Sequence, residues 1–329
     1  MKVAVFSTKA YDREYLDKLN NNIQQLTYFK AALNAGTTNL SIGFDAVCVF
    51  VNDTVDKAVI EKLAANGIKI IALRCAGFNN VDIAAAAANN IKVVRVPAYS
   101  PQAVAEHAVA LILTLNRKTH KAYNRVREGN FSIEKLTGFN LYNKTVGVIG
   151  TGKIGIAFCN IMLGFGCKVI ASDLFESAYL KEKGVLYKSI DEILNQSDII
   201  SLHCPLTPET KYLFNSIAFN KMNDGAMLIN TSRGALIKTA DAIEALKTGK
   251  LGYLGIDVYE QEENIFFKDL SESIIHDDLI ERLISFHNVL ITPHQGFFTN
   301  EALDQIATTT LKNLTDFEKG LPLDNEIKV

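Results

Sequence analysis

The stretch that decides the fold runs from Thr145 to Gly155 and reads TVGVIGTGKIG. Its apolar start predicts a buried strand, and the glycines that follow have the spacing G-x-G-x-x-G. An apolar helical pattern, Ile154–Phe165, comes next, and a second strand pattern, Lys168–Ala171, leads to Asp173. Strand, glycine turn, helix, strand and acidic residue therefore stand in the order of a dinucleotide-binding unit.

Each part of this motif has a physical task. Gly150 permits the tight turn, Gly152 lets the backbone approach a pyrophosphate, and Gly155 allows the helix to pack closely on the strand. The first amides of the helix, which can bind the phosphates, belong to Lys153 and Ile154. Asp173 is expected to accept hydrogen bonds from the adenosine ribose and to repel a 2′-phosphate, which predicts NAD rather than NADP. The alternative is a glycine turn that binds no ligand.

On both sides of the motif, short apolar runs alternate with helical patterns. The other predicted strands are Val3–Phe6, Ala46–Val51, Lys69–Leu73, Lys92–Val96, Asp198–Leu202, Ala226–Asn230, Leu254–Val258 and Val289–Ile291. Such runs, separated by helices, are typical of parallel sheets that are covered on both faces. We therefore expect an α/β fold with two Rossmann-like parallel-sheet domains, one flavodoxin-like and one dinucleotide-binding, and a cleft between them.

A long helical pattern from Ser100 to Arg127 separates the two series of strands, and we expect one continuous crossover helix there. Ser100 can cap this helix and Pro101 suits its first turn. The last helix, Asn300–Lys319, lies in a tail too short to form its own core, so it should pack on the first domain. The predicted domains are residues 100–296, which bind the dinucleotide, and a discontinuous domain of residues 1–99 plus 297–329.

The composition limits the class of protein. Basic residues (34) and acidic residues (36) are evenly mixed, so we expect no nucleic-acid or membrane partner. No apolar stretch approaches the roughly 18 residues that span a bilayer, and the start lacks the order of a signal peptide. The five cysteines are scattered without a Cys-x-x-Cys pair, which argues against disulfides and a metal site. These features predict a cytoplasmic protein.

Three predicted strands are each followed by a residue suited to chemistry on an anionic substrate. These residues are Arg233 after Ala226–Asn230, a carboxylate of the stretch Asp257–Glu262 at the end of Leu254–Val258, and His294 after Val289–Ile291. Open α/β sheets bind ligands at the carboxyl ends of their strands. Arginine can clamp a carboxylate and histidine can donate a proton, which is what hydride transfer to a 2-oxo acid requires.

With these motifs the chain resembles the D-isomer-specific 2-hydroxyacid dehydrogenases, most closely their fermentative D-lactate branch. The resemblance covers essentially the whole chain. Besides the glycine motif, it is carried by Arg74–Asp82, Val96–Pro101, Ala105–His107, His203–Thr207, Asn230–Gly234, Asp257–Glu262 and Pro293–His294.

The resemblance implies an NAD-dependent oxidoreductase that interconverts pyruvate and D-lactate. Arg233 would bind the substrate carboxylate and polarise the oxo group. His294 would be the general acid in reduction and the base in oxidation, and Glu262 would hydrogen-bond the histidine. A carboxylate beside an imidazole favours its protonated form, which keeps a proton available.

The resemblance also implies roles for residues around this centre. Asp257 and the backbone of Thr231 and Ser232 would position the nicotinamide, and the adenosine side would be lined by His203, Cys204 and Pro205. The amides of Cys75, Ala76 and Gly77 would grip the substrate carboxylate. The substrate methyl would be surrounded by Phe50, Tyr99 and Phe297. The discontinuous domain would be the substrate domain, closing over the NAD-binding domain across a hinge, and the family expectation is a homodimer through residues 100–127 and their neighbours.

Several alternatives stay open at this point. Glu260 and Glu263 are neighbours of Glu262, so a slip of one residue would change the assigned carboxylate. Cys75 fits a small buried hydrophobe better than a redox thiol, and the aromatic residues also fit ordinary core. The histidines without a partner in the sequence, which we assign to structure, are His107, His120, His276 and His287. The alternative functions are a dehydrogenase of bulkier branched 2-oxo acids and an NAD-sensing binding protein on the same fold.

Overall fold

The computed structural model describes residues 1–328, which divide into two compact units. Unit 1 comprises residues 1–100 and the segment that begins at Phe297, and unit 2 comprises residues 101–296. The expected division placed Ser100 with the second unit. In the structure Ser100 belongs to unit 1, because the first helix of unit 2 begins at Pro101.

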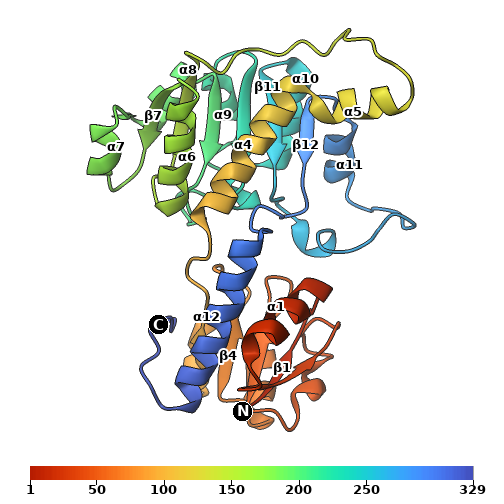
Figure 1. Ribbon diagram of the computed structural model, residues 1–329, viewed down its shortest axis with the longest axis vertical. Coiled ribbons are helices and arrows are strands. Elements are labelled where there is room, and N and C mark those ends of the chain that lie inside the picture. The colour runs from red at the N-terminus through yellow and green to blue at the C-terminus, as the bar shows by residue number, and fades with distance from the viewer. Residues whose placement is uncertain (329) are drawn as a thin grey trace. The chain divides into compact units, whose positions relative to one another are not determined.

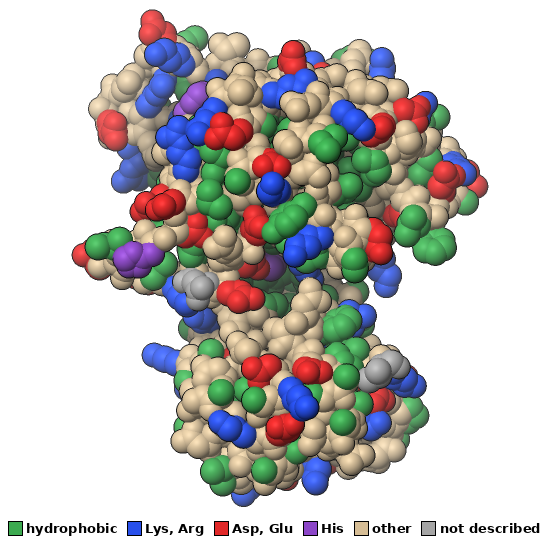
Figure 2. Space-filling view, turned by 180° about the vertical axis from the view of Figure 1, so that it is seen from behind, with side chains coloured by type: hydrophobic (Ala, Val, Ile, Leu, Met, Phe, Trp, Pro, Cys, Tyr) green, Lys and Arg blue, Asp and Glu red, His purple; other side chains and the backbone are tan. Residues whose placement is uncertain are grey.

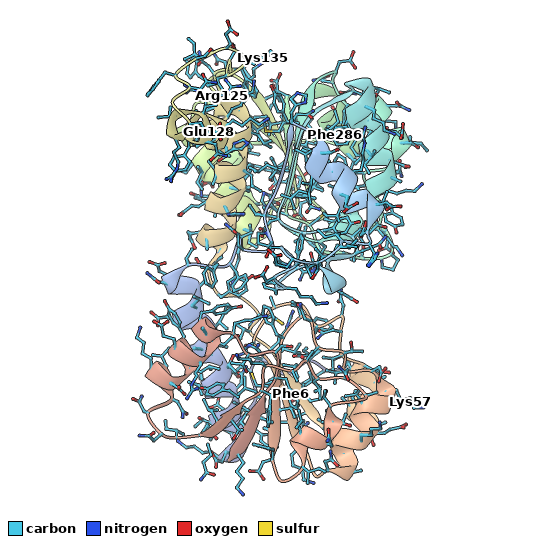
Figure 3. The ribbon with its side chains drawn as sticks, turned by 90° about the vertical axis from the view of Figure 1, so that its right-hand side faces the viewer. Phe6, Lys57, Arg125, Glu128, Lys135 and Phe286 are labelled. Atoms are coloured by element: carbon cyan, nitrogen blue, oxygen red, sulfur yellow. The ribbon has the colours of Figure 1, made fainter. Side chains whose placement is uncertain are left out.

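Unit 1 is built on a parallel sheet with the strand order β2-β1-β3-β4-β5. The strands are β1 (Lys2–Val5), β2 (Gln25–Tyr28), β3 (Ala46–Val49), β4 (Ile70–Leu73) and β5 (Lys92–Val94). This is the flavodoxin-like order. Phe6, directly after β1, is fully buried among the side chains of this unit (Figure 3).

Helices cover both faces of this sheet. They are α1 (Ala10–Asn20), α2 (Lys57–Ala65), α3 (Ile83–Ala88) and α12 (Asn300–Glu318), with a short 3₁₀ helix, η1 (Thr38–Ser41). The C-terminal helix α12 packs beside α1 and against β4 (Figure 1). Its Ala307, Leu311 and Leu314 are buried in the same core as residues of β1, β3 and β4, which is why this late segment belongs to unit 1.

Unit 2 contains a parallel sheet of seven strands in the order β12-β11-β10-β9-β6-β7-β8. The strands are β6 (Thr145–Ile149), β7 (Lys168–Ser172), β8 (Leu186–Tyr187), β9 (Ile199–Leu202), β10 (Ala226–Asn230), β11 (Leu251–Ile256) and β12 (Val289–Ile291). Within this sheet β6 is the first strand in the sequence; β7 and β8 follow on one side of it, and the strands from β9 to β12 follow on the other side. The order therefore reverses between β6 and β9, where open α/β sheets bind ligands.

Helices cover both faces of this second sheet (Figure 1). A hydrophobic core cluster lies on each face, between the helices and the sheet. On one face lie α4 (Pro101–Arg117) and α6 (Lys153–Gly164). On the other face lie α8 (Ile190–Gln196), α9 (Ser216–Lys221), α10 (Thr239–Thr248) and α11 (Asp278–Ser285). The remaining elements are α5 (Thr119–Arg127), α7 (Ala178–Glu182), η2 (Gly234–Leu236) and η3 (Glu262–Asn264). The two predicted α/β sheets are thus confirmed.

The expected continuous helix from Ser100 to Arg127 is wrong. It breaks into α4 and α5 at Lys118, whose backbone is left-handed (φ 51°). The Lys118 ammonium donates hydrogen bonds to the carbonyl oxygens of Lys135 (2.8 Å) and Thr137 (3.1 Å). The side chain of Lys118 thus anchors the irregular segment between α5 and β6. Helical periodicity in the sequence cannot indicate this contact.

Charged side chains of both signs share the surface. On the face drawn in Figure 2, basic and acidic side chains are interspersed over both units. Within residues 1–328, none of the helices combines the length and the apolar character that a membrane span needs.

Candidate active site

The turn after β12 presents His294 beside a carboxylate. His294 Nδ1 lies 2.9 Å from Glu262 Oε1, and the two side chains are 21% and 23% exposed. The histidine backbone is left-handed (φ 54°), and its N–H donates to the carbonyl oxygen of Thr292. Because Glu262 occupies Nδ1, Nε2 is the ring nitrogen that remains for a ligand.

The same turn is held by Asp257, which follows β11. Asp257 is buried, and its Oδ1 accepts hydrogen bonds from the Thr292 hydroxyl (2.5 Å) and the Gln295 N–H (2.8 Å), while Oδ2 accepts one from the Gly296 N–H (2.8 Å). The carboxylate is thus used to fix the turn that carries His294. The predicted contact of Asp257 with the nicotinamide stays a prediction.

His107, assigned to structure from the sequence, belongs to this arrangement. Its Nε2 lies 3.0 Å from the Thr292 hydroxyl and 3.2 Å from Asp257 Oδ1. The partners are far away in the sequence, so no local signal indicated them. The Ala105–His107 stretch, which contributed to the family resemblance, was the only hint.

Of the three neighbouring glutamates, Glu262 is the one that faces His294. Its Oε2 also accepts a hydrogen bond from the Tyr259 N–H (2.9 Å), which fixes the side chain. Glu260 instead binds the Tyr212 hydroxyl (2.5 Å) and the Thr239 N–H (3.1 Å), and Glu263 is exposed.

Sequence reasoning missed Phe267, whose ring packs near His294. The ring centroids are 6.0 Å apart with an angle of 35° between the planes. Phe266 is buried in the core, whereas Phe267, whose backbone is left-handed (φ 63°), is partly buried and packs against the same core as well as near the imidazole. Left-handed phenylalanine is strained and persists only where its surroundings enforce it.

Arg233 lies in the turn after β10, close to the segment that carries Glu262. Asn230 ties this turn together, because its amide donates to the Arg233 carbonyl oxygen (2.9 Å) and accepts from the Ser232 N–H (3.0 Å). A Cβ at Gly234 would collide with the Tyr259 backbone, so the two turns touch directly. Among residues 1–328 no ion pair involves Arg233, which leaves its positive charge for a ligand.

The glycine motif lies at the reversal point of the sheet. Gly150 is left-handed (φ 95°), and a Cβ there would lie 2.6 Å from the backbone N of Cys204. A Cβ at Gly155 would collide with the Gly150 carbonyl oxygen. At Gly152, the N-cap of α6, a Cβ would meet nothing within 4 Å, and no side chain caps the helix. This open backbone, in front of free helix amides, fits a dinucleotide pyrophosphate.

The residues next to this motif also fit a nucleotide. His203 contacts the Phe158 ring (centroids 4.8 Å apart), and burial lowers its pKa to about 3, so the imidazole is neutral and forms part of a wall. The Ser232 hydroxyl donates to the Cys204 carbonyl oxygen (2.6 Å), which joins two predicted cofactor segments. The buried Thr231 hydroxyl has no hydrogen-bond partner within residues 1–328, which is consistent with a partner supplied by a ligand.

In unit 1 the structure brings together the three aromatic residues predicted to surround the substrate methyl. Phe297 lies between Phe50 and Tyr99, with centroid distances of 6.2 Å and 6.3 Å. Cys75 is buried, and its thiol donates to the Gly77 carbonyl oxygen (3.3 Å), within the predicted carboxylate-binding loop. This environment suits a small packed side chain rather than a redox thiol.

A buried ion pair packs against the ring of Phe50, and the sequence did not indicate it. Arg74 Nε is 3.0 Å from Asp12 Oδ1, and both side chains are almost fully buried. The guanidinium carbon lies 4.9 Å from the centre of the Phe50 ring. Asp53 accepts hydrogen bonds from the Phe50 N–H (2.6 Å) and the Ser7 hydroxyl (2.7 Å), so ring and backbone of Phe50 are both fixed.

No group of three or more His, Cys, Asp or Glu residues suited to a metal occurs within residues 1–328. The charged groups of unit 2 are instead arranged for an anion and a proton. Residues 109–296 match the family model described as the NAD binding domain of D-isomer specific 2-hydroxyacid dehydrogenases. The chain belongs to this family.

Relatives of this family match over the full length of the chain. The D-lactate dehydrogenase of Escherichia coli K12 is 53% identical over 99% of this chain and 100% of its own. A solved structure of the pyruvate reductase of Chlamydomonas reinhardtii has a TM-score of 0.94 at 44% identity and covers 99% of this chain and 98% of that one. The structure of a D-2-hydroxyisocaproate dehydrogenase has a TM-score of 0.86 at 33% identity, covering 99% of both chains.

These similarities confirm the predictions made for this 2-hydroxyacid dehydrogenase at the level of fold, enzyme class and cofactor. Unit 2 contains the NAD binding domain, and the chain is an NAD-dependent enzyme. The roles of individual residues do not follow from the similarities, so they are argued from the geometry.

Proposed function

We propose that this dehydrogenase reduces pyruvate to D-lactate with NADH, and reverses the reaction when D-lactate and NAD are in excess. The observation that carries the proposal is the 2.9 Å hydrogen bond between His294 Nδ1 and Glu262 Oε1. It leaves Nε2 as a proton donor in the same unit as Arg233, which forms no ion pair within residues 1–328. A proton donor and an anion clamp are the two groups that a 2-oxo acid needs.

In this proposal each side chain has one task. When bound, NADH supplies a hydride to C2 of the substrate. His294 Nε2 gives its proton to the carbonyl oxygen, so the C=O double bond becomes a C–O–H group. Glu262 stabilises the protonated imidazole before the transfer, and Arg233 binds the carboxylate through paired N–H groups. In the reverse direction His294 accepts the hydroxyl proton.

Unit 1 is proposed as the substrate domain. Its amides at Cys75, Ala76 and Gly77 would bind the substrate carboxylate, and the rings of Phe50 and Tyr99 would limit the size of the substrate side chain. Such a pocket discriminates by only about 1–3 kcal/mol per methylene. We therefore expect pyruvate to be preferred and 2-oxobutyrate to react more slowly.

The substrate assignment is tested by NADH oxidation with pyruvate, 2-oxobutyrate, 2-oxoisocaproate and phenylpyruvate, followed by chiral analysis of the product. The expected result is the highest kcat/KM for pyruvate and a product of the D configuration. A higher kcat/KM for 2-oxoisocaproate would refute the pyruvate preference and favour a function like that of the D-2-hydroxyisocaproate dehydrogenase relative. Failure to turn over any of these acids at millimolar concentration would favour an NAD-sensing binding protein.

The residue roles are tested with two variants and two matched controls. His294→Ala should lower kcat by about 10²–10⁴-fold, and Arg233→Gln should raise the KM for pyruvate by at least about tenfold. NADH affinity should be retained in both. The controls are His276→Ala and Arg282→Gln, which change exposed residues of unit 2. Unchanged turnover in His294→Ala would remove the histidine from the mechanism.

We also propose that the enzyme is a homodimer through α5 and the segment that follows it. This region exposes large apolar side chains, with Phe131 75% and Ile133 82% exposed. The segment is nevertheless fixed, because Arg125 donates to the Glu134 carbonyl oxygen (2.8 Å). Figure 3 shows Arg125, Glu128 and Lys135 in this part of unit 2. A rigid, exposed apolar surface is typical of an interface.

The dimer is tested by light scattering after size-exclusion chromatography. Replacing Ile133 by Asp should shift the mass from a dimer to a single chain. The control is Ile217→Asp, which alters an isoleucine on α9 that is 66% exposed. A wild-type mass of one chain would refute the proposal.

The proposed location is the cytoplasm. Within residues 1–328 all five cysteines are buried and none is joined in a disulfide, as expected in a compartment that keeps thiols reduced. Fractionation of source cells should place the pyruvate-reducing activity with the cytosolic proteins. Recovery with the extracellular fraction would contradict this location.

A further inference from the structure

Asp173 already binds several donors of the chain itself. Its Oδ2 accepts hydrogen bonds from the Thr151 N–H and from the Thr151 hydroxyl (3.1 Å). Its Oδ1 accepts one from the Phe175 N–H (2.9 Å). The Leu174 backbone is a further hydrogen-bond donor to this carboxylate. A carboxylate oxygen offers two lone pairs, so the two Thr151 donors occupy Oδ2, and we expect a ribose hydroxyl to bind at Oδ1.

The Thr151 hydroxyl is part of a longer chain of hydrogen bonds. The Ser177 N–H donates to the Tyr187 hydroxyl oxygen (2.8 Å), and the Tyr187 hydroxyl donates to Thr151 Oγ1 (3.0 Å). An N–H can only donate, and an ionised carboxylate can only accept. The hydrogen bonds therefore run in one direction, in which each hydroxyl donates its hydrogen bond toward Asp173.

This relay connects three separate segments around one carboxylate. Thr151 is buried between the first two glycines of the motif, and Tyr187 lies on β8 beside Ala171 of β7. Ser177 is the N-cap of α7. Burial by itself raises the pKa of Asp173, but the hydrogen bonds from Phe175 and Thr151 outweigh burial and hold the pKa below its usual value. The carboxylate is thus ionised and restrained.

We propose that Thr151 and Tyr187 are positioning residues that strengthen the preference for NAD over NADP by restraining the Asp173 carboxylate. A restrained carboxylate cannot swing toward solvent when a 2′-phosphate approaches, so the repulsion between the two anions is kept. The same restraint presents Oδ1 to the ribose hydroxyls of NAD. Without the relay, the side chain can rotate away, and NADPH is rejected less strongly.

The test is the ratio of the Kd values for NADPH and NADH, measured by fluorescence titration of the full chain. The variants are Thr151→Val and Tyr187→Phe, which remove one hydroxyl each and keep the shape. Loss of one hydrogen bond in the relay should lower the ratio by about fivefold. The control is Tyr179→Phe, which removes a hydroxyl bound to Asn160 on the same part of unit 2 and should leave the ratio unchanged.

A double-mutant cycle separates positioning from a general structural effect. In an Asp173→Asn background, Tyr187→Phe should change the ratio no further, because the relay acts through the carboxylate. An unchanged ratio in both single variants would overturn the proposal, as would an equal effect of Tyr187→Phe with and without Asp173. The readout is binding and not turnover, so the result is independent of the proposed pyruvate reduction. Thermal unfolding of each variant verifies that it is folded, and the conservative Tyr187→Phe variant keeps the test decisive if Thr151→Val does not fold.

Discussion

The neutral His203 gives a prediction about stability at acidic pH. Its ring packs on Phe158, its Nε2 lies 2.9 Å from the Ser201 hydroxyl, and burial lowers its pKa to about 3. In the unfolded chain the pKa of histidine is about 6.5. Between these values the unfolded chain binds a proton that the folded protein does not. The stability contributed by neutral His203 is therefore fully present above pH 6.5 and is lost as the pH falls toward 3.

The size of this loss follows from the two pKa values. A pH of 5 lies about 1.5 units below the pKa of the histidine in the unfolded chain, and each unit corresponds to about 1.4 kcal/mol in the free energy of unfolding. The free energy of unfolding should therefore be lower by about 2 kcal/mol at pH 5 through His203 alone. Replacement by Gln, which does not titrate, should remove this part of the pH dependence.

The assay is urea unfolding followed by circular dichroism at pH 7.5 and pH 5.0. The decrease in the free energy of unfolding between the two pH values should be about 2 kcal/mol smaller in His203→Gln than in the wild type. His276→Gln, which changes an exposed histidine, should keep the wild-type decrease. If His203→Gln loses as much stability as the wild type on acidification, the reasoning from burial is refuted.

Three further predictions concern the two units separately. Phe267→Leu should lower kcat several-fold with unchanged NADH affinity, because the His294 imidazole loses its ring contact. Phe267→Tyr, which keeps the ring, should retain the wild-type kcat. Equal kcat values for Phe267→Leu and the wild type in steady-state assays would show that the ring contact does not contribute to turnover. Asp12→Asn should reduce the free energy of unfolding in urea by about 3–5 kcal/mol, because Arg74 stays buried without its counter-ion; a change below 1 kcal/mol would contradict this. Phe50→Leu should raise kcat/KM for 2-oxoisocaproate relative to pyruvate by about tenfold, and a falling ratio would show that this ring does not limit the substrate.

Much of the fold was determined by the sequence because buried parallel strands are short continuous apolar runs. Strands β6, β10 and β12 begin and end where the sequence predicts. Two strands were missed. β8 contains only Leu186 and Tyr187, and β2 is a half-exposed edge strand without an apolar run. β11 begins at Leu251 and ends at Ile256, earlier than predicted, because glycines interrupt its apolar pattern.

That an arginine, a carboxylate and a histidine follow predicted strands could be inferred from the sequence, and the family resemblance pointed to Arg233, Glu262 and His294. The atoms that contact one another could not be predicted. The choice of Glu262 over Glu260 depends on how the turn after β11 folds back on itself, and that is set by the Tyr259 N–H.

The sequence by itself determined the two sheets, the glycine motif with its cofactor, and the kinds of chemical group in the site, because these depend on local patterns of burial and spacing. Tertiary structure alone decided the contacts of His107 with Asp257, of Phe267 with His294, and of Tyr187 with Thr151. Each of these contacts joins segments that are far apart or irregular in the chain. Hydrogen bonds and ring contacts of this kind depend on three-dimensional distances that no periodicity along the sequence encodes.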